Sequence, residues 1–156
     1  MKRFLSLAVC AASAAFAVLA APMNGHARQG GDLGLGFIAG NPSGLSGKLW
    51  LGESNALDFI VGFDLVDDHI SLNADYVWHE FGLIPVNRGQ LPLYYGMGLW
   101  TSVARHAAFG ARGVIGIEYI FPGAPLDAFL ELAPGTSLLP RTRFDVDAGI
   151  GMRFFF

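Results

Sequence analysis

The residue types that best suit catalysis occur in the stretch "HISLNADYVWHE", from His69 to Glu80. His69 and Ser71 are two residues apart, so they face the same side of an extended strand, and Asn73 and Asp75 follow on that side. In acyl-transfer catalysis a carboxylate orients a histidine, and the histidine removes the proton of a serine hydroxyl. His69 and Ser71 are therefore the candidate catalytic residues, but two neighbours on one strand do not fix a triad.

The same stretch resembles the His-x-Ser-Asn motif of lipid A deacylases, which are eight-stranded barrels, and this resemblance implies a lipid-modifying hydrolase. The motif is broken here, because Leu72 stands between Ser71 and Asn73. His69 and His79 are separated by about 33 Å along a strand, too far to share a metal ion. No other metal-ligand spacing and no phosphate-binding glycine loop occurs, so we predict neither a metal nor a cofactor.

A second constellation consists of charged residues that all have the same parity within alternating segments of the chain. Its members are Lys48, Asp58, Asp64, Asp75, Arg112, Glu118, Glu131, Asp145, Asp147 and Arg153, with Asp127 and Arg143 on the same face. Inside a barrel such charges must be paired, so they predict a lumen network that joins opposite walls. The interior of an eight-stranded barrel is just filled by side chains, which disfavours a channel. A narrow pore, if open, would favour cations, because carboxylates are in excess.

Eight segments with alternating apolar and polar residues must position these charges. They cover residues 32–39, 45–51, 56–66, 69–79, 90–101, 109–121, 126–133 and 143–156. Turn-forming residues separate them, with the longest connection at 80–89 and a proline-bounded loop at 134–140. Such short connections are typical of an up-and-down antiparallel meander.

The composition of the two faces predicts which one points outward. One face is apolar without interruption, and the other combines glycines and charges with Trp50, Tyr94, Trp100 and Phe129. Glycine beside large aromatic residues suits a crowded interior, where small and large side chains interlock. We therefore predict an all-β, eight-stranded antiparallel up-and-down transmembrane β-barrel with its apolar face toward lipid. A soluble periplasmic barrel that binds an apolar ligand inside is the alternative with the opposite sidedness.

The N-terminal residues have the pattern of a signal peptide. Lys2 and Arg3 precede an apolar stretch that is short for a membrane span, and small residues follow, so we expect residues 1–27 to be the leader and residues 28–156 the barrel domain. After residue 27 the chain has no cysteine, which argues against a disulfide framework. The same part of the chain has 8 basic and 13 acidic residues and no basic stripe, which argues against nucleic-acid binding.

The chain ends in "DAGIGMRFFF", whose apolar face is formed by Ile150, Met152, Phe154 and Phe156. This ending resembles the C-terminal signature of bacterial outer-membrane barrel proteins, and the resemblance implies that the barrel assembly machinery recognises it. The stretches "NPSGLSGKLWL", "LPLYYGMG" and "FPGAPLDAFLELAP" resemble a family of small uncharacterised outer-membrane β-barrel proteins that includes spirochaete members. That resemblance implies a barrel of the OmpA-domain or OmpX kind with no established activity.

The sequence thus predicts a monomeric outer-membrane barrel that contacts outer-membrane lipid and the assembly machinery, with a structural or surface-interaction role and no enzymatic activity. The lipid-modifying hydrolase, the cation pore and the soluble barrel are the alternatives.

Overall fold

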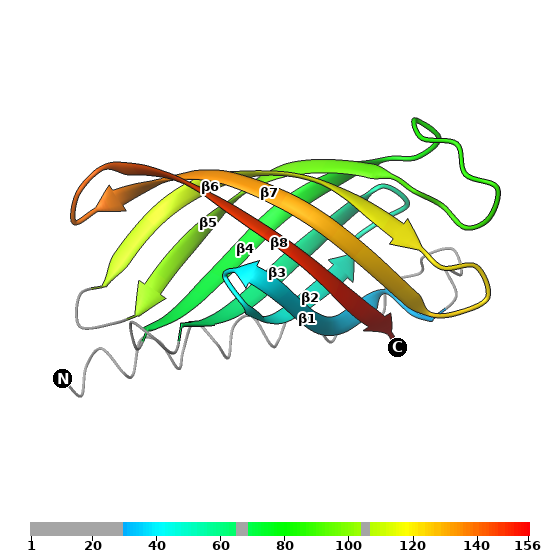
Figure 1. The fold of residues 1–156 in the computed structure, drawn as a ribbon, viewed down its shortest axis with the longest axis horizontal. Helices are drawn as coiled ribbons and strands as arrows, with labels where there is room; N and C mark the ends of the chain where they lie inside the picture. The colour runs from blue at the N-terminus through cyan, green and yellow to red at the C-terminus, as the bar shows by residue number, and fades with distance from the viewer. Residues whose placement is uncertain (1–29, 65–68, 104–106) are drawn as a thin grey trace.

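The computed structural model describes residues 30–64, 69–103 and 107–156, which form one closed barrel of eight antiparallel strands (Figure 1). Each strand pairs with the next one in the sequence, and the last strand pairs with the first, which confirms the predicted up-and-down topology. The strands are β1 (Leu33–Asn41), β2 (Gly44–Trp50), β3 (Asn55–Asp64), β4 (His69–Glu80), β5 (Leu93–Val103), β6 (Ala108–Ile120), β7 (Leu126–Leu139) and β8 (Arg143–Phe155). The predicted signal peptide, residues 1–27, lies outside the described residues.

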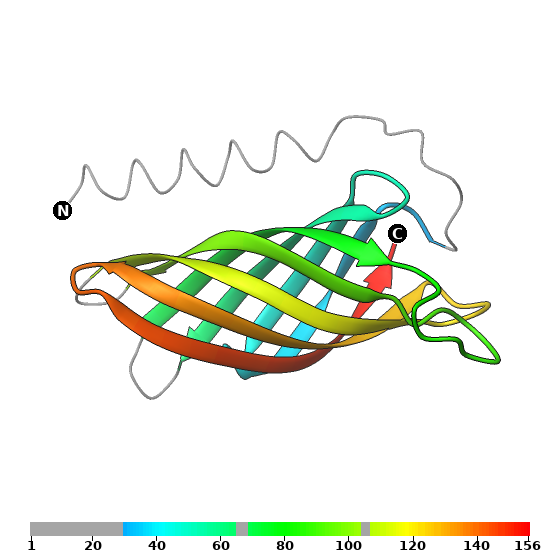
Figure 2. The same cartoon turned by 90° about the horizontal axis from the view of Figure 1, so that it is seen from above.

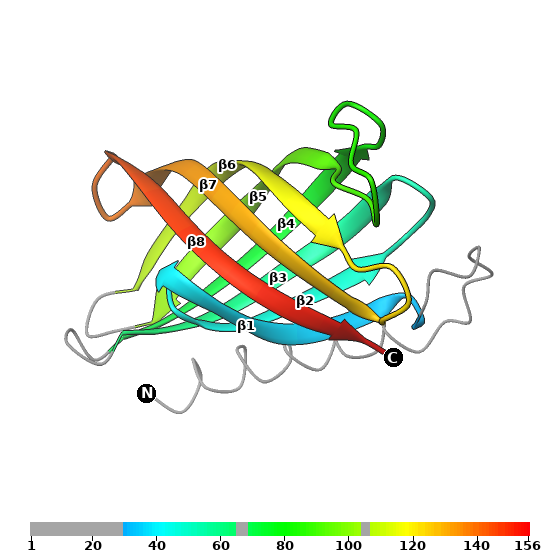
Figure 3. The same ribbon diagram turned by 45° about the vertical axis from the view of Figure 1, so that its right-hand side comes forward.

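The barrel closes through the terminal strands, β1 and β8. Their ladder runs from Gly34 opposite Phe155 to Asn41 opposite Ala148, and Figures 2 and 3 show the two strands side by side. Closure leaves no open sheet edge, as is required where no water is available to bond a free backbone N–H or C=O group. Among the described residues, no helix is long and apolar enough to cross a membrane.

The predicted loop at residues 134–140 is wrong, because β7 continues to Leu139. Proline cannot donate a hydrogen bond, so a proline normally ends or edges a strand. Here the ladder to β8 continues through Pro134, opposite Val146, whereas the ladder to β6 skips the step between Leu132 and Gly135. The strand tolerates Pro134 because the missing donor falls where β6 and β7 are not bonded.

The outer wall of the barrel is apolar, and the inner wall carries the charges. Phe63 and Ile117 on the outer face are 45% and 36% exposed. Asp58 and Glu118 point to the opposite side of their strands and are only 4% and 0% exposed. This sidedness confirms the predicted orientation. A soluble barrel with an apolar lumen requires the reverse arrangement, so that alternative is wrong for the described part of the chain.

The two ends of the barrel differ in the connections they carry. We call the end with Phe156 and the connections 51–54, 81–92 and 121–125 the terminal end, and the opposite end, where β1 joins β2 and β7 joins β8, the mouth end. Aromatic residues ring the outer wall at the terminal end, where Trp78 stacks on Tyr95 with ring centroids 6.1 Å apart and Tyr119 contacts Phe121 at 4.8 Å. Aromatic rings at this level are typical of the girdle at a membrane interface.

Candidate functional site

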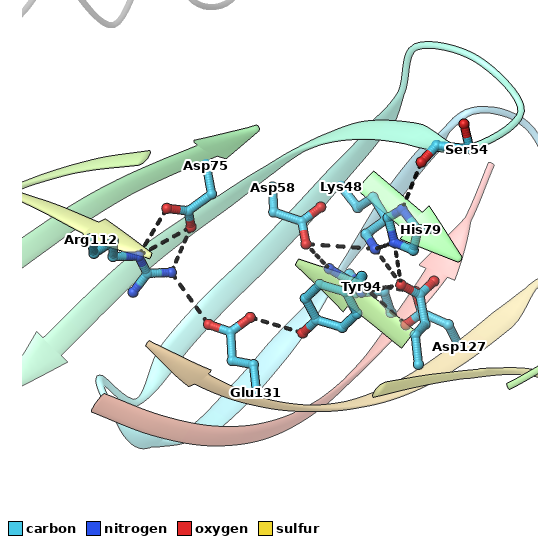
Figure 4. A network of polar contacts seen from close by, with 11 residues as sticks. Lys48, Ser54, Asp58, Asp75, His79, Tyr94, Arg112, Asp127 and Glu131 are labelled. Carbon is cyan, nitrogen blue, oxygen red and sulfur yellow. Dashed lines mark hydrogen bonds and ion pairs between the residues drawn. The ribbon is translucent and has the colours of Figure 1, made fainter. Parts of the chain in front are cut away.

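Two basic residues, Lys48 of β2 and Arg153 of β8, form the centre of a buried charge cluster near the terminal end of the lumen. Figure 4 shows Lys48 beside Asp58 and His79 in this cluster. The Lys48 ammonium bonds to Glu118 of β6, and it lies 3.6 Å from Asp58 on the neighbouring strand β3. The Arg153 guanidinium donates through Nε to Asp127 of β7 at 3.0 and 3.1 Å. Its other nitrogens reach Asp58 at 3.3 Å and Glu118 at 3.4 Å. The cluster therefore joins strands that are not neighbours in the barrel.

A second cluster is centred on Arg112 of β6. Its Nη2 donates to Asp75 of β4 at 2.6 Å and its Nε to the same carboxylate at 2.9 Å, a bidentate geometry that is strong and directional. Nη2 also contacts Glu131 of β7 at 3.3 Å, and Glu131 accepts a hydrogen bond from the Tyr94 hydroxyl at 3.0 Å. Tyr94 links the two clusters, because its ring lies 5.0 Å from the Lys48 nitrogen.

The glycines of the inner face make room for these large side chains. A Cβ added to Gly98 would lie 2.1 Å from the Oδ1 atom of Asp75. Gly98 and Gly135 are the register partners of Arg112 on the two neighbouring strands, β5 and β7. The combination of glycine and bulky residues on one face, visible in the sequence, thus reflects the packing of the charge network.

Aromatic side chains close the lumen beside the Lys48 cluster. The ring of Trp50 lies 4.3 Å from the ring of His79, which stacks on Tyr94 at 5.4 Å, and Phe81 packs against both Trp50 and His79. The His79 Nε2 atom lies 2.8 Å from the Lys48 nitrogen and 3.1 Å from Glu118. The terminal end of the lumen is therefore filled by aromatic and charged groups with almost no exposed surface.

The mouth end is open instead. A cavity of about 810 Å³ occupies it, lined by residues of nearly every strand. Asp145 and Asp147 lie here, not in the buried network where the sequence analysis placed them. Asp145 is exposed and pairs at 3.5 Å with the exposed Arg143, and Asp147 accepts a hydrogen bond from the Asn41 amide at 2.7 Å. Both follow the inward parity, but β8 extends beyond the packed part of the lumen.

The remaining predicted site residues are placed as follows. Ser71 lines the mouth cavity on the inner side of β4. His69 and Asp64 face each other in the β3–β4 register, but their side chains lie outside the described part of the structure. Ile150, Met152, Phe154 and Phe156 all face outward, whereas Phe155 is buried inside the barrel.

The sequence analysis counted Asp127 among the charges of the network but assigned no role in it to His79 or Tyr94. Alternation placed all three on the inner face, but their partners are set by the stagger of the strands. The described residues contain no group of three histidine, cysteine or acidic side chains that would hold a metal ion.

Comparison with known proteins adds one likeness of fold. No family model matches the chain, and no curated protein sequence matches it. The resemblance to a family of small barrels with spirochaete members therefore stays a prediction. The fold is similar to the N-terminal β-barrel domain of OprF from Pseudomonas aeruginosa, with a TM-score of 0.58 and 18% sequence identity over 81% of this chain and 98% of that one. At this identity the likeness concerns the fold alone: the chain has a closed eight-stranded barrel like that of OprF, with a buried network of charges inside.

Proposed function

We propose that this protein is an integral outer-membrane barrel that does not conduct, with a structural or surface-interaction role. The observation that carries the proposal is the seal at the terminal end, where Lys48, Glu118 and Asp127 are all fully buried. A water-filled ion path would expose such groups, because ions move past side chains that they can contact. The exposed apolar outer wall and the OprF-like fold support residence in the outer membrane.

The orientation of the barrel follows from which connections must cross the bilayer. A chain that enters from the periplasm keeps both ends of the barrel domain on the periplasmic side, so only the mouth-end connections are translocated. The mouth-end connections lie between Asn41 and Gly44, Asp64 and His69, Val103 and Ala108, and Leu139 and Arg143, and all are short. The long connection at 81–92 belongs to the terminal end and need not cross. The mouth cavity then opens to the exterior.

Conductance of purified barrels in planar bilayers tests the proposal. Insertion is first verified by the difference in gel migration between unheated and boiled samples. We expect no current steps above the lipid baseline from wild-type protein. Reproducible steps with cation selectivity would contradict the proposal and favour the pore. Recovery of the native protein in the periplasmic fraction without detergent would contradict its residence in the membrane.

The hydrolase alternative keeps one supporting feature, the spacing of His69 and Ser71 in the sequence. Ser71 lines the inside of the mouth, whereas acyl chains of membrane lipid meet the outer wall. Only the polar headgroup of a lipid would reach Ser71. The proposal of a non-enzymatic barrel therefore expects Ser71→Ala to leave lipid A unchanged.

A further inference from the structure

The mouth cavity contains polar groups that the protein itself leaves without partners. Arg112 and Asn73 both line it, and they are only 4% and 6% exposed. Their Nη1 and Nδ2 atoms are buried and have no hydrogen-bond partner among the described residues, and Figure 4 shows the Arg112 nitrogen without a contact. A buried donor without a partner lowers the stability of the folded protein, so its position favours a ligand that supplies an acceptor oxygen.

The Arg112 donor is held in a fixed position. The bidentate pair with Asp75 fixes the plane of the Arg112 guanidinium. Glu131 also accepts a hydrogen bond from Nη2, one of the two nitrogens that bond to Asp75. Asn73 lies on β4, two residues from Asp75 on the same inner face, at the inner limit of the cavity. A group that is already immobile loses little conformational freedom when a ligand binds, which favours recognition at this point.

Trp100 supplies an apolar wall beside the donors. In the β4–β5 register Trp100 is directly opposite Asn73, and in the β5–β6 register it is opposite Gly110. A Cβ added to Gly110 would lie 2.5 Å from the indole Nε1 atom, so the indole lies against the inner wall where the sheet has no side chain. Asn73, Trp100 and Gly110 thus form a row across three strands, with an amide next to a flat aromatic surface.

The charges around the cavity indicate a neutral ligand. The positive charge of Arg112 is already matched by Asp75 and Glu131. At the rim Arg141 and Arg143 are balanced by Asp145 and Asp147. An anion would gain no net attraction here, whereas an amide such as that of Asn73 offers both a donor and an acceptor, which complements a hydroxyl group.

From these observations we infer that the mouth cavity binds a neutral saccharide. Its hydroxyl and ring oxygens accept hydrogen bonds from Arg112 and Asn73, and the apolar face of one sugar ring packs on Trp100. A volume of about 810 Å³ lies within the range of small-molecule sites. The inference goes beyond the proposed function, and it does not depend on whether the lumen conducts.

The test uses the full barrel folded in detergent micelles and titrated with maltotriose by calorimetry, with sodium sulfate as the anionic probe. Asn73→Leu removes the amide and keeps a similar branched shape, and Trp100→Leu removes the aromatic wall. Met97→Leu is the matched control, because Met97 lies on the same strand as Trp100 but faces outward at 66% exposure. The gel-migration difference verifies that each variant is folded.

We expect saturable binding of maltotriose in the millimolar range. Asn73→Leu should weaken it about fivefold or more, as for the loss of one hydrogen bond, and Trp100→Leu should weaken it to a similar extent through the loss of ring packing. Met97→Leu should leave the affinity unchanged. Absence of saturable binding by the wild-type protein overturns the inference, as does saturation by sulfate alone. Equal affinity in the wild type and both lumen variants also overturns it. Vesicles that carry a neutral glycolipid distinguish the source: competition assigns the saccharide to a lipid headgroup, and lack of competition assigns it to a soluble glycan.

Discussion

Replacing Arg153 by methionine removes the cation that contacts the largest number of carboxylates in the lumen. Arg153 is 2% exposed, lies within 3.4 Å of Asp58, Glu118 and Asp127, and covers the ring of Phe129 at 4.1 Å. Methionine keeps part of the apolar packing but leaves Asp127 without its two guanidinium hydrogen bonds. Loss of one partner from a buried ion pair costs about 3–5 kcal/mol. With a urea dependence of roughly 2 kcal/mol per molar, the midpoint of unfolding falls by about 1.5–2.5 M.

The assay is urea unfolding of the barrel in lipid vesicles, followed by the fraction that migrates as folded on a gel. Arg143→Met is the matched control, because the Arg143 and Asp145 side chains of that pair are 79% and 63% exposed. An exposed pair contributes about 0–1 kcal/mol, so the control should unfold near the wild type. The double variant Arg153→Met with Asp127→Leu should recover much of the loss, because no unpaired carboxylate remains at position 127. Equal midpoints for Arg153→Met and Arg143→Met would refute the reasoning.

Three further predictions concern the wall and the mouth. Gly98→Ala should destabilise the barrel by about 1–3 kcal/mol, because its Cβ would meet Asp75 and the Ala74 carbonyl. Gly47→Ala is the control and should leave the stability unchanged, because the nearest atom to its Cβ would be 3.5 Å away. Equal unfolding midpoints of the two variants would contradict this. Leu130→Arg on the outer wall should cost about 2–4 kcal/mol in vesicles if Leu130 lies near the middle of the bilayer, and an unchanged midpoint would contradict its contact with lipid. Ser71→Ala should leave the mass spectrum of lipid A unchanged, and a shift in acyl content would favour the hydrolase.

The fold was predictable because the alternation of side chains has a period of two residues and every strand obeys it. Parity alone placed Lys48, Glu118 and Arg153 inside and Phe63 and Ile117 outside. The pairing of these charges was not predictable. Lys48 and Glu118 are 70 residues apart in the sequence, and their contact depends on the stagger between strands. The same reason explains why Asp145 and Asp147 have the predicted parity but lie at the mouth, since parity does not give height along the barrel axis.

Pro134 marks another limit of sequence reasoning. A proline ends most strands, and the sequence gives no sign of which neighbouring strand its missing donor would face. The structure shows that it faces an interrupted step of the ladder to β6, so β7 continues and carries Ser137 to the mouth. The unpartnered donors of Arg112 and Asn73 were equally invisible, because a missing partner is a property of the assembled barrel.

The central claim is that apolar side chains of the barrel contact lipid and charged ones face its axis. Nitroxide labels on cysteines introduced at Leu99, Ile115 and Leu130 test it most directly, by their collision rates with oxygen dissolved in the bilayer and with a water-soluble nickel complex. These positions are 52%, 48% and 49% exposed on the outer wall. The account predicts high collision rates with oxygen and low rates with nickel at all three. High nickel and low oxygen rates at these positions would contradict it.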